Sequence, residues 1–201
     1  MKTVQVITPT RTEIRMELAL FREYLAARER RYRILLGISE AQPIANNRNR
    51  IARKMLADGA DYVLMIDSDT VPRGFNPLDY VENDLDVLGF PNPMWRANDD
   101  CPISWFPAPP SDAGLVEVEE MAAGCLLIAR RVLEHPAMRG PFLDYWDADG
   151  LRIESEDQSF CRRAREAGFK VWCAMDRPIA HFKPVELTTM WEYVERVRCQ
   201  S

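Results

Sequence analysis

The sequence predicts a single α/β domain built on a mostly parallel, twisted central sheet with helices on both faces. Apolar strand-like runs alternate with helix-like segments through the first half of the chain, the pattern of a sheet whose crossover connections are helices. Tyr62–Ile66 is an uninterrupted apolar run, which is typical of a strand buried on both faces. At 201 residues the chain has the length of one domain with a substantial core.

The first half of the chain is expected to form most of the sheet. Its helices carry apolar residues at helical spacing, and Gly59 provides a stop signal for the second one. Right-handed crossovers would place the strands in one open sheet. In chain order the expected elements are a strand Thr3–Thr8 ending at Pro9, a helix Glu13–Arg30, a strand Tyr32–Gly37, a helix Ala45–Asp58, and strands Tyr62–Ile66 and Val87–Phe90.

The second half is less regular. Prolines and tryptophans between Pro91 and Pro110 indicate a long loop, and loops of that length in a compact domain are commonly functional. After it we expect strands Leu115–Met121 and Cys125–Ala129, a short helix Arg130–Leu133, a helix Glu156–Ala167 ended by Gly168, a strand Lys170–Cys173 and a C-terminal helix Leu187–Val197.

Composition narrows the class of protein. The net charge of −5 argues against a general nucleic-acid binder, because such affinity comes mainly from neutralising phosphates. No apolar run reaches the roughly 18–20 residues of a membrane span. The five cysteines are scattered without a Cys-x-x-Cys pair, so we expect reduced thiols and a cytoplasmic protein.

Asp67-Ser68-Asp69 directly follows the predicted strand Tyr62–Ile66. In an extended segment, residues two apart project from the same face, so both carboxylates would point at one ligand. Carboxylate oxygens suit hard divalent cations, and ligands of α/β sheets bind where strands end. A metal site that handles phosphate is one interpretation, and a polar turn carrying two aspartates is the other.

Three further groups of polar residues have a functional and a structural interpretation. Asn46, Asn49, Arg50 and Arg53 share a helix face that suits an anion, or they are a solvated face. The Glu156-Asp157 pair suits proton transfer, or only the helix dipole. His181 suits a metal shell, or the core.

Taken in order, these segments resemble the glycosyltransferase A-fold (GT-A) superfamily, and within it a small family-2-like nucleotide-sugar transferase. The resemblance covers roughly residues 3 to 184 and implies a Rossmann-like GT-A domain. Residues 1–90 would be its nucleotide-binding half, 91–184 its acceptor and catalytic half, and 185–201 a C-terminal helix. The segments are Thr8-Pro9-Thr10-Arg11, the Asn/Arg helix, Asp67-Ser68-Asp69, Ala122-Ala123-Gly124-Cys125, Ser155-Glu156-Asp157 and Ala180-His181-Phe182.

The resemblance implies a metal-dependent transfer of a sugar from a nucleotide-diphosphate sugar, with UDP or GDP as the nucleotide, to a hydroxyl acceptor. Asp157 would act as the base of an inverting reaction, with Glu156 nearby. Retention stays open, and in that case Glu156 or Asp157 would instead stabilise an oxocarbenium-like species. The cation would be Mn²⁺ or Mg²⁺. Asp67, Asp69 and His181 would surround this cation. Donor contacts would come from Thr8, Pro9, Thr10, Arg11, Arg48, Asn49, Asp67, Ser68 and Gly124.

Some features depart from the family pattern or fit other classes. Ser39 and Glu40 stand where an acidic residue often reads uracil, so the donor base stays open. The acceptor stays open too: a glycan, a small molecule, a protein or modified DNA. Asp67 would also suit the nucleophile of a haloacid-dehalogenase-type phosphatase, but no lysine lies between Lys54 and Lys170 to support it. A non-catalytic nucleotide- or glycan-binding module is the third possibility.

Overall fold

The computed structural model describes residues 1–10, 13–95, 103–184 and 187–200. Its centre is a seven-stranded sheet in the order β2-β1-β3-β9-β5-β12-β8. Strands β1, β2, β3, β5 and β12 run in one direction, and β8 and β9 run the opposite way. The strands are β1 Thr3–Thr10, β2 Arg33–Glu40, β3 Tyr62–Ile66, β5 Val87–Gly89, β8 Leu115–Glu117, β9 Cys125–Ala129 and β12 Val171–Ala174.

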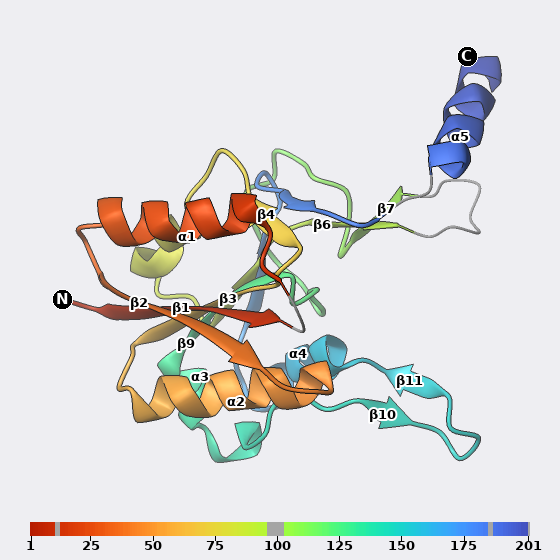
Figure 1. Cartoon of the computed structure of the whole chain (residues 1–201). Coiled ribbons are helices and arrows are strands. Elements are labelled where there is room, and N and C mark those ends of the chain that lie inside the picture. Colours follow the sequence, from red (N-terminus) through yellow and green to blue (C-terminus); the bar gives the residue numbers. More distant parts are fainter. Residues whose placement is uncertain (11–12, 96–102, 185–186, 201) are drawn as a thin grey trace.

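Helices cover both faces of this sheet, as Figure 1 shows. Helix α1 lies over one face, whereas α2, α3 and α4 lie on the other. The adjacent strands β3 and β9 are buried along their whole length between these layers, which explains why both consist almost entirely of large apolar residues. The helices are α1 Met16–Arg28, α2 Ile44–Ala57, α3 Arg130–Glu134 and α4 Glu156–Glu166, with 3-10 turns at Pro77–Asn83 and Pro136–Met138.

Three antiparallel ribbons and the last helix lie outside the central sheet. The hairpin β10–β11 extends beyond the carboxyl ends of the parallel strands, and α5 projects away from the body of the domain (Figure 1). Among the described residues, no helix is long and apolar enough to cross a membrane. The outer elements are β4 Thr70–Pro72 with β13 Ile179–His181, β6 Asn92–Trp95 with β7 Ile103–Phe106, β10 Tyr145–Trp146 with β11 Arg152–Glu154, and α5 Leu187–Gln200.

The predicted α/β class is confirmed, and β3 has the predicted bounds. The long loop predicted between Pro91 and Pro110 is wrong in part, because β6 and β7 form a ribbon there. Pro93 pairs with Trp105 within it, and a two-stranded ribbon has only edge strands, where proline is tolerated. Strand β1 continues through Pro9 to Thr10 beside β2, although a stop at Pro9 was expected.

Asn49 joins α2 to the segment that precedes β10. Its Nδ2 donates to the Phe142 carbonyl at 2.7 Å, and its Oδ1 accepts from the Phe142 N–H at 3.0 Å. The Phe142 ring stacks on Phe160 of α4 at 4.5 Å between centroids. Asn49 is only 7% exposed, so both hydrogen bonds lie in the interior and fix α2 relative to α4.

We predict that Asn49→Ala lowers the free energy of unfolding by about 1–3 kcal/mol, because it leaves the buried N–H and carbonyl of Phe142 without partners. Urea denaturation of the wild type and variant measures this difference. Asn46→Ala is the matched control: Asn46 lies on the exposed side of the same helix, and its replacement should change stability by no more than about 0.5 kcal/mol. Equal effects at the two positions would contradict the role given to Asn49.

Candidate active site

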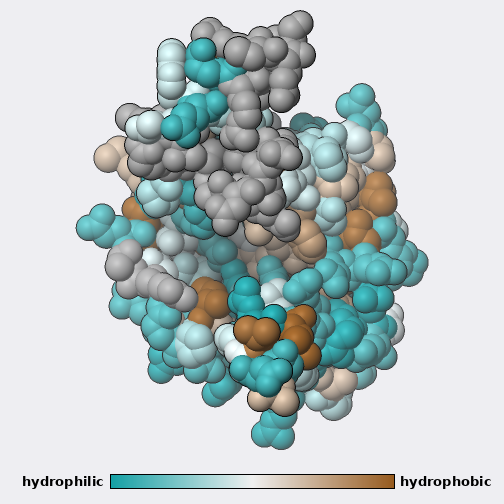
Figure 2. All heavy atoms as spheres, turned by 90° about the vertical axis from the view of Figure 1, so that its right-hand side faces the viewer, coloured by the Kyte–Doolittle hydropathy of each residue, from teal (hydrophilic) through white to brown (hydrophobic). Residues whose placement is uncertain are grey.

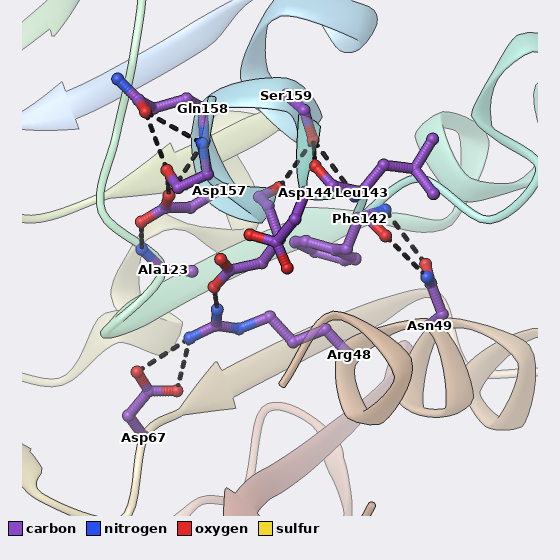
Figure 3. A network of polar contacts seen from close by, with 12 residues as sticks. Arg48, Asn49, Asp67, Ala123, Phe142, Leu143, Asp144, Asp157, Gln158 and Ser159 are labelled. Atoms are coloured by element: carbon purple, nitrogen blue, oxygen red, sulfur yellow. Dashed lines mark hydrogen bonds and ion pairs between the residues drawn. The ribbon is translucent and has the colours of Figure 1, made fainter. Parts of the chain in front are cut away.

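Arg48 lies at the centre of the candidate site and joins α2 and the end of β3 to α4, which lies about a hundred residues further along the chain. Its Nη2 donates to both carboxylate oxygens of Asp67, each at 2.8 Å, and its Nη1 donates to Glu156 Oε1. Figure 3 shows the guanidinium reaching from α2 to the end of β3 and the start of α4. Arg48 is 3% exposed and Glu156 6%, so their contact is shielded from water, whereas the Asp67 side chain stays 26% exposed.

The charges around Arg48 do not balance. Three carboxylates, those of Asp67, Glu156 and Asp157, act on this one guanidinium. Burial disfavours the charged form of Arg48, but the three carboxylates outweigh burial and raise its pKa. Burial also raises the pKa of Glu156, and the Asp157 charge adds to this while Arg48 opposes it. Burial raises the pKa of Asp67 in the same way, against the effect of Arg48. The cluster therefore favours additional positive charge, whether a cation or a proton.

Asp157 is held at the first turn of α4 by its own backbone surroundings. Its Oδ1 accepts from the Gln158 N–H at 3.0 Å and from the Ser155 hydroxyl. Among the described residues, its Oδ2 has one long contact, 3.4 Å, with the Ala123 N–H (Figure 3). Ser155 and Gln158 form a capping box at this helix start, which orders the turn. One oxygen of Asp157 is thus fixed, and the other is available to a ligand.

These groups line a cleft of about 530 Å³ at the carboxyl end of β3, next to the start of the antiparallel strand β9 and the start of α4. Figure 2 faces this side of the molecule and shows a hollow near its middle with hydrophilic side chains around it. This position agrees with the rule that open α/β sheets bind ligands beyond the carboxyl ends of their strands. The lining residues are Ile44, Arg48, Asp67, Asn92, Met94, Phe106, Ala122, Ala123, Gly124, Arg152, Ser155, Glu156, Asp157 and Gln158.

Asp69 and His181 meet through the ribbon β4–β13. His181 pairs with Thr70 in this ribbon, and its Nε2 lies 3.4 Å from Asp69 Oδ2. The same oxygen accepts from Lys183 Nζ at 2.5 Å. Burial acts to raise the pKa of Asp69, but hydrogen bonds from His181 and Lys183 outweigh it and lower that pKa to about 2. Asp69 is therefore a carboxylate at neutral pH.

The groups at Asp69 suit a divalent cation that is completed by a substrate. His181 Nδ1 lies 2.8 Å from the Pro93 carbonyl. With its proton on Nδ1, the imidazole would offer Nε2 to a cation in place of the hydrogen bond that this nitrogen now makes to Asp69. Within the described residues, no three metal-ligating side chains form a ready cage. Mg²⁺ and similar ions are commonly held by one or two carboxylates together with substrate phosphates, and Asp69 and His181 fit that pattern.

Asp67 and Asp69 do not share a target. A turn follows β3, closed by a hydrogen bond from the Thr70 N–H to the Asp67 carbonyl at 3.0 Å. Both Asp67 oxygens bind Arg48, whereas Asp69 faces His181 and Lys183. The expectation of an extended segment aiming both carboxylates at one ligand is therefore wrong, because these residues form a turn.

The other predicted donor residues are more dispersed. Thr8 and Thr10 are buried at the end of β1, and Pro9 between them pairs with Ser39. Ser68 is half-buried in the turn after β3, and Arg11 lies outside the described residues.

Asn49 and the predicted helix face lie away from the cleft. Asn49 borders a different and larger cavity, of about 940 Å³, between α2 and α3. Ile44 and Arg48 are the residues of α2 that line the cleft. The face shared by Asn46, Arg50 and Arg53 is exposed, so the anion site predicted there is not part of this cleft.

Gly124 lines the cleft, and the protein itself explains why no side chain stands there. A Cβ at this position would lie 3.0 Å from Asn92 Nδ2 and 3.2 Å from both Ile179 Cδ1 and Thr70 Cγ2. The Gly124 carbonyl also accepts from the Asp67 N–H at 2.9 Å and from the Thr70 hydroxyl at 2.6 Å. Gly124 thus fixes the turn that carries the aspartates.

Several cleft residues were not singled out from the sequence. Asn92, Met94 and Phe106 enter through the ribbon β6–β7, and Arg152 through β11. Strand signals in short proline-containing segments are weak, so this part of the lining had no clear pattern. Lys183 did have one: it lies two residues after His181, and in extended chain such residues project from the same face.

No family model and no curated protein matches the sequence. Solved structures do match the fold. A197 from STIV superposes with a TM-score of 0.57 at 18% identity, over 90% of this chain and 86% of that chain. GalNAc-T7, solved with UDP, GalNAc and Mn²⁺, superposes with a TM-score of 0.58 at 14% identity, over 96% of this chain. The match spans about half, 48%, of the GalNAc-T7 chain. Together with the order of the sheet, these likenesses show that the chain has the glycosyltransferase A-fold.

Proposed function

We propose that the chain is a metal-dependent glycosyltransferase that moves a sugar from a nucleotide-diphosphate sugar to a hydroxyl acceptor, with inversion at the anomeric carbon. The observation that carries this proposal is the cleft at the carboxyl end of β3. It brings Arg48, Asp67, Glu156 and Asp157 together, with the Asp69–His181 pair on the turn and ribbon that follow β3. The glycosyltransferase A-fold supports the same reaction class.

The charge of the cleft supports the need for a divalent cation. The cleft lining holds three carboxylates and two guanidinium groups, those of Arg48 and Arg152, and a donor diphosphate would add further negative charge. Like charges in a shielded site repel strongly. Mn²⁺ or Mg²⁺ held by Asp69, His181 and the diphosphate would neutralise the charge that develops as the sugar–phosphate bond breaks.

Asp157 is the proposed general base. The acceptor oxygen attacks the anomeric carbon, the bond from that carbon to the diphosphate oxygen breaks, and the nucleoside diphosphate leaves with the bonding electron pair. Asp157 takes the acceptor proton through Oδ2, the oxygen with the long 3.4 Å contact to the Ala123 N–H. Glu156 is less suited to this step, because its carboxylate is bound to Arg48 and is 6% exposed.

The nucleoside is proposed to lie over the ends of β1 and β2. There Pro9 pairs with Ser39 and Thr10 with Glu40, so the segments expected to read the donor base lie side by side. GalNAc-T7 was solved with UDP and Mn²⁺, which makes UDP-sugars with Mn²⁺ the first donors to test, and GDP-sugars the second.

The geometry disfavours the phosphatase alternative. A phosphatase nucleophile at Asp67 needs a free carboxylate oxygen, and both oxygens of Asp67 accept hydrogen bonds from Arg48 at 2.8 Å. A non-catalytic binding module would retain donor binding but show no turnover, so the experiments below separate it from an enzyme.

We predict that the wild type hydrolyses a UDP- or GDP-sugar slowly in the presence of Mn²⁺, and that Asp69→Ala reduces this rate roughly a hundredfold, because the cation loses its carboxylate ligand. Release of the nucleoside diphosphate is measured across a panel of donors. Asp112→Ala, at an exposed turn residue, is the control and should match the wild type. Phosphate covalently trapped on Asp67 would instead establish the phosphatase.

Asp157→Asn should reduce transfer by roughly 10²–10⁴-fold, the usual contribution of a positioned general base, while the dissociation constant for the donor stays near that of the wild type. Transfer is followed with hydroxyl acceptors, and donor binding by calorimetry. Glu166→Gln removes a charge at the far end of the same helix α4 and serves as the control. A variant with the transfer rate of the wild type would show that Asp157 is not the base.

A further inference from the structure

Lys183 occupies the position on Asp69 where the proposed site needs a metal ion. Its Nζ lies 2.5 Å from Asp69 Oδ2, and His181 Nε2 lies 3.4 Å from the same oxygen. An ammonium, an imidazole and a carboxylate thus converge on one point. The sequence motifs give no role to this lysine.

Simultaneous binding of the Lys183 ammonium and a divalent cation to Asp69 Oδ2 is electrostatically unfavourable. Both are positive, and at separations of a few ångströms their repulsion is substantial even in a partly solvated site. The Lys183 side chain is 44% exposed, and a lysine ammonium sits on a flexible stem. Lys183 is therefore able to leave Asp69 without disturbing the core.

The backbone is fixed next to both partners of the Lys183–Asp69 ion pair. The Phe182 N–H donates to the Asp69 carbonyl at 2.8 Å, and His181 pairs with Thr70 in β13–β4. The guanidinium groups of Arg15 and Arg73 lie 4.2 and 5.2 Å from the Phe182 ring centroid. These contacts hold the backbone next to Lys183, so the exchange needs only the Lys183 side chain to move.

We propose that Lys183 holds the cation's place on Asp69 in the metal-free protein, leaves when a divalent cation binds, and then pairs with the donor diphosphate. This inference rests on the proposed function and deepens it, because it assigns a residue to the exchange between the metal-free and donor-bound states. Asp69 is paired with positive charge in both states, and Lys183 changes its partner between them.

The test measures Mn²⁺ binding and UDP binding separately, by calorimetry, in the wild type and in Lys183→Met. Without nucleotide, Lys183→Met should bind Mn²⁺ about fivefold more tightly, since it loses a competing ion pair of the kind found at partly exposed sites. With saturating Mn²⁺, the same variant should bind UDP about fivefold more weakly, because one partner of the diphosphate is gone. The two effects have opposite signs, which general damage to the site would not produce.

Two control variants separate charge from position. Lys183→Arg keeps the positive charge and should stay close to the wild type in both titrations. Lys170→Met removes the same charge at a distant position, where Lys170 pairs with Glu117 at 2.8 Å before β12. It should leave both affinities unchanged.

Equal or weaker Mn²⁺ binding by Lys183→Met, with thermal unfolding like that of the wild type, would overturn the inference. Absence of Mn²⁺ binding in both proteins would overturn it too. Sugar transfer that persists in the presence of a chelator would support a glycosyltransferase that needs no metal. That result would overturn the role of Lys183 but not the transfer reaction. Failure of the inference is therefore distinguishable from failure of the proposed function.

Discussion

The buried guanidinium of Arg48 is the constraint on which the candidate site depends. Asp67 follows β3 and Glu156 begins α4, and these elements come from opposite halves of the chain. Their carboxylates can lie in one interior only because a cation lies between them, since burying unpaired charge is very costly. Helix α2 supplies that cation, and Asn49, the next residue, fixes the helix through Phe142. Arg48 therefore compensates the carboxylate charges, and the adjacent Asn49 holds the helix that carries Arg48.

This arrangement divides the acidic residues into two groups. Asp67 and Glu156 are engaged with Arg48 and shape the cleft. Asp157 and Asp69 each have one oxygen whose partner can be replaced. For Asp157 that partner is the distant Ala123 N–H, and for Asp69 it is the Lys183 ammonium. Proton transfer and cation binding both require a carboxylate that can change partners during a reaction cycle. The proposed roles of Asp157 and Asp69 follow from that difference in engagement.

The sequence predicted those parts of the fold whose signals are local and strong. β3 is an apolar run between a glycine-closed helix and a polar turn, and its bounds were predicted correctly. The ribbons β6–β7 and β10–β11 were missed, because their short strands gain stability from placement against the domain rather than from a long repeating pattern. Motif order identified Arg48, Asp67, Gly124, Glu156 and Asp157, which all line the cleft. It could not show that Arg48 binds the carboxylates themselves.

The same spacing rule failed at one place and would have succeeded at another. Residues two apart share a face only while the backbone stays extended. Asp67 and Asp69 stand in the turn after β3, and they face different partners. His181 ends β13, and Lys183 follows two residues later; both side chains reach Asp69 Oδ2. Whether two residues of such a pair face the same partner therefore depends on whether the pair lies in a turn, as Asp67 and Asp69 do, or continues from a strand, as His181 and Lys183 do. Here that depends on the pairing of β4 with β13, a contact between segments more than a hundred residues apart.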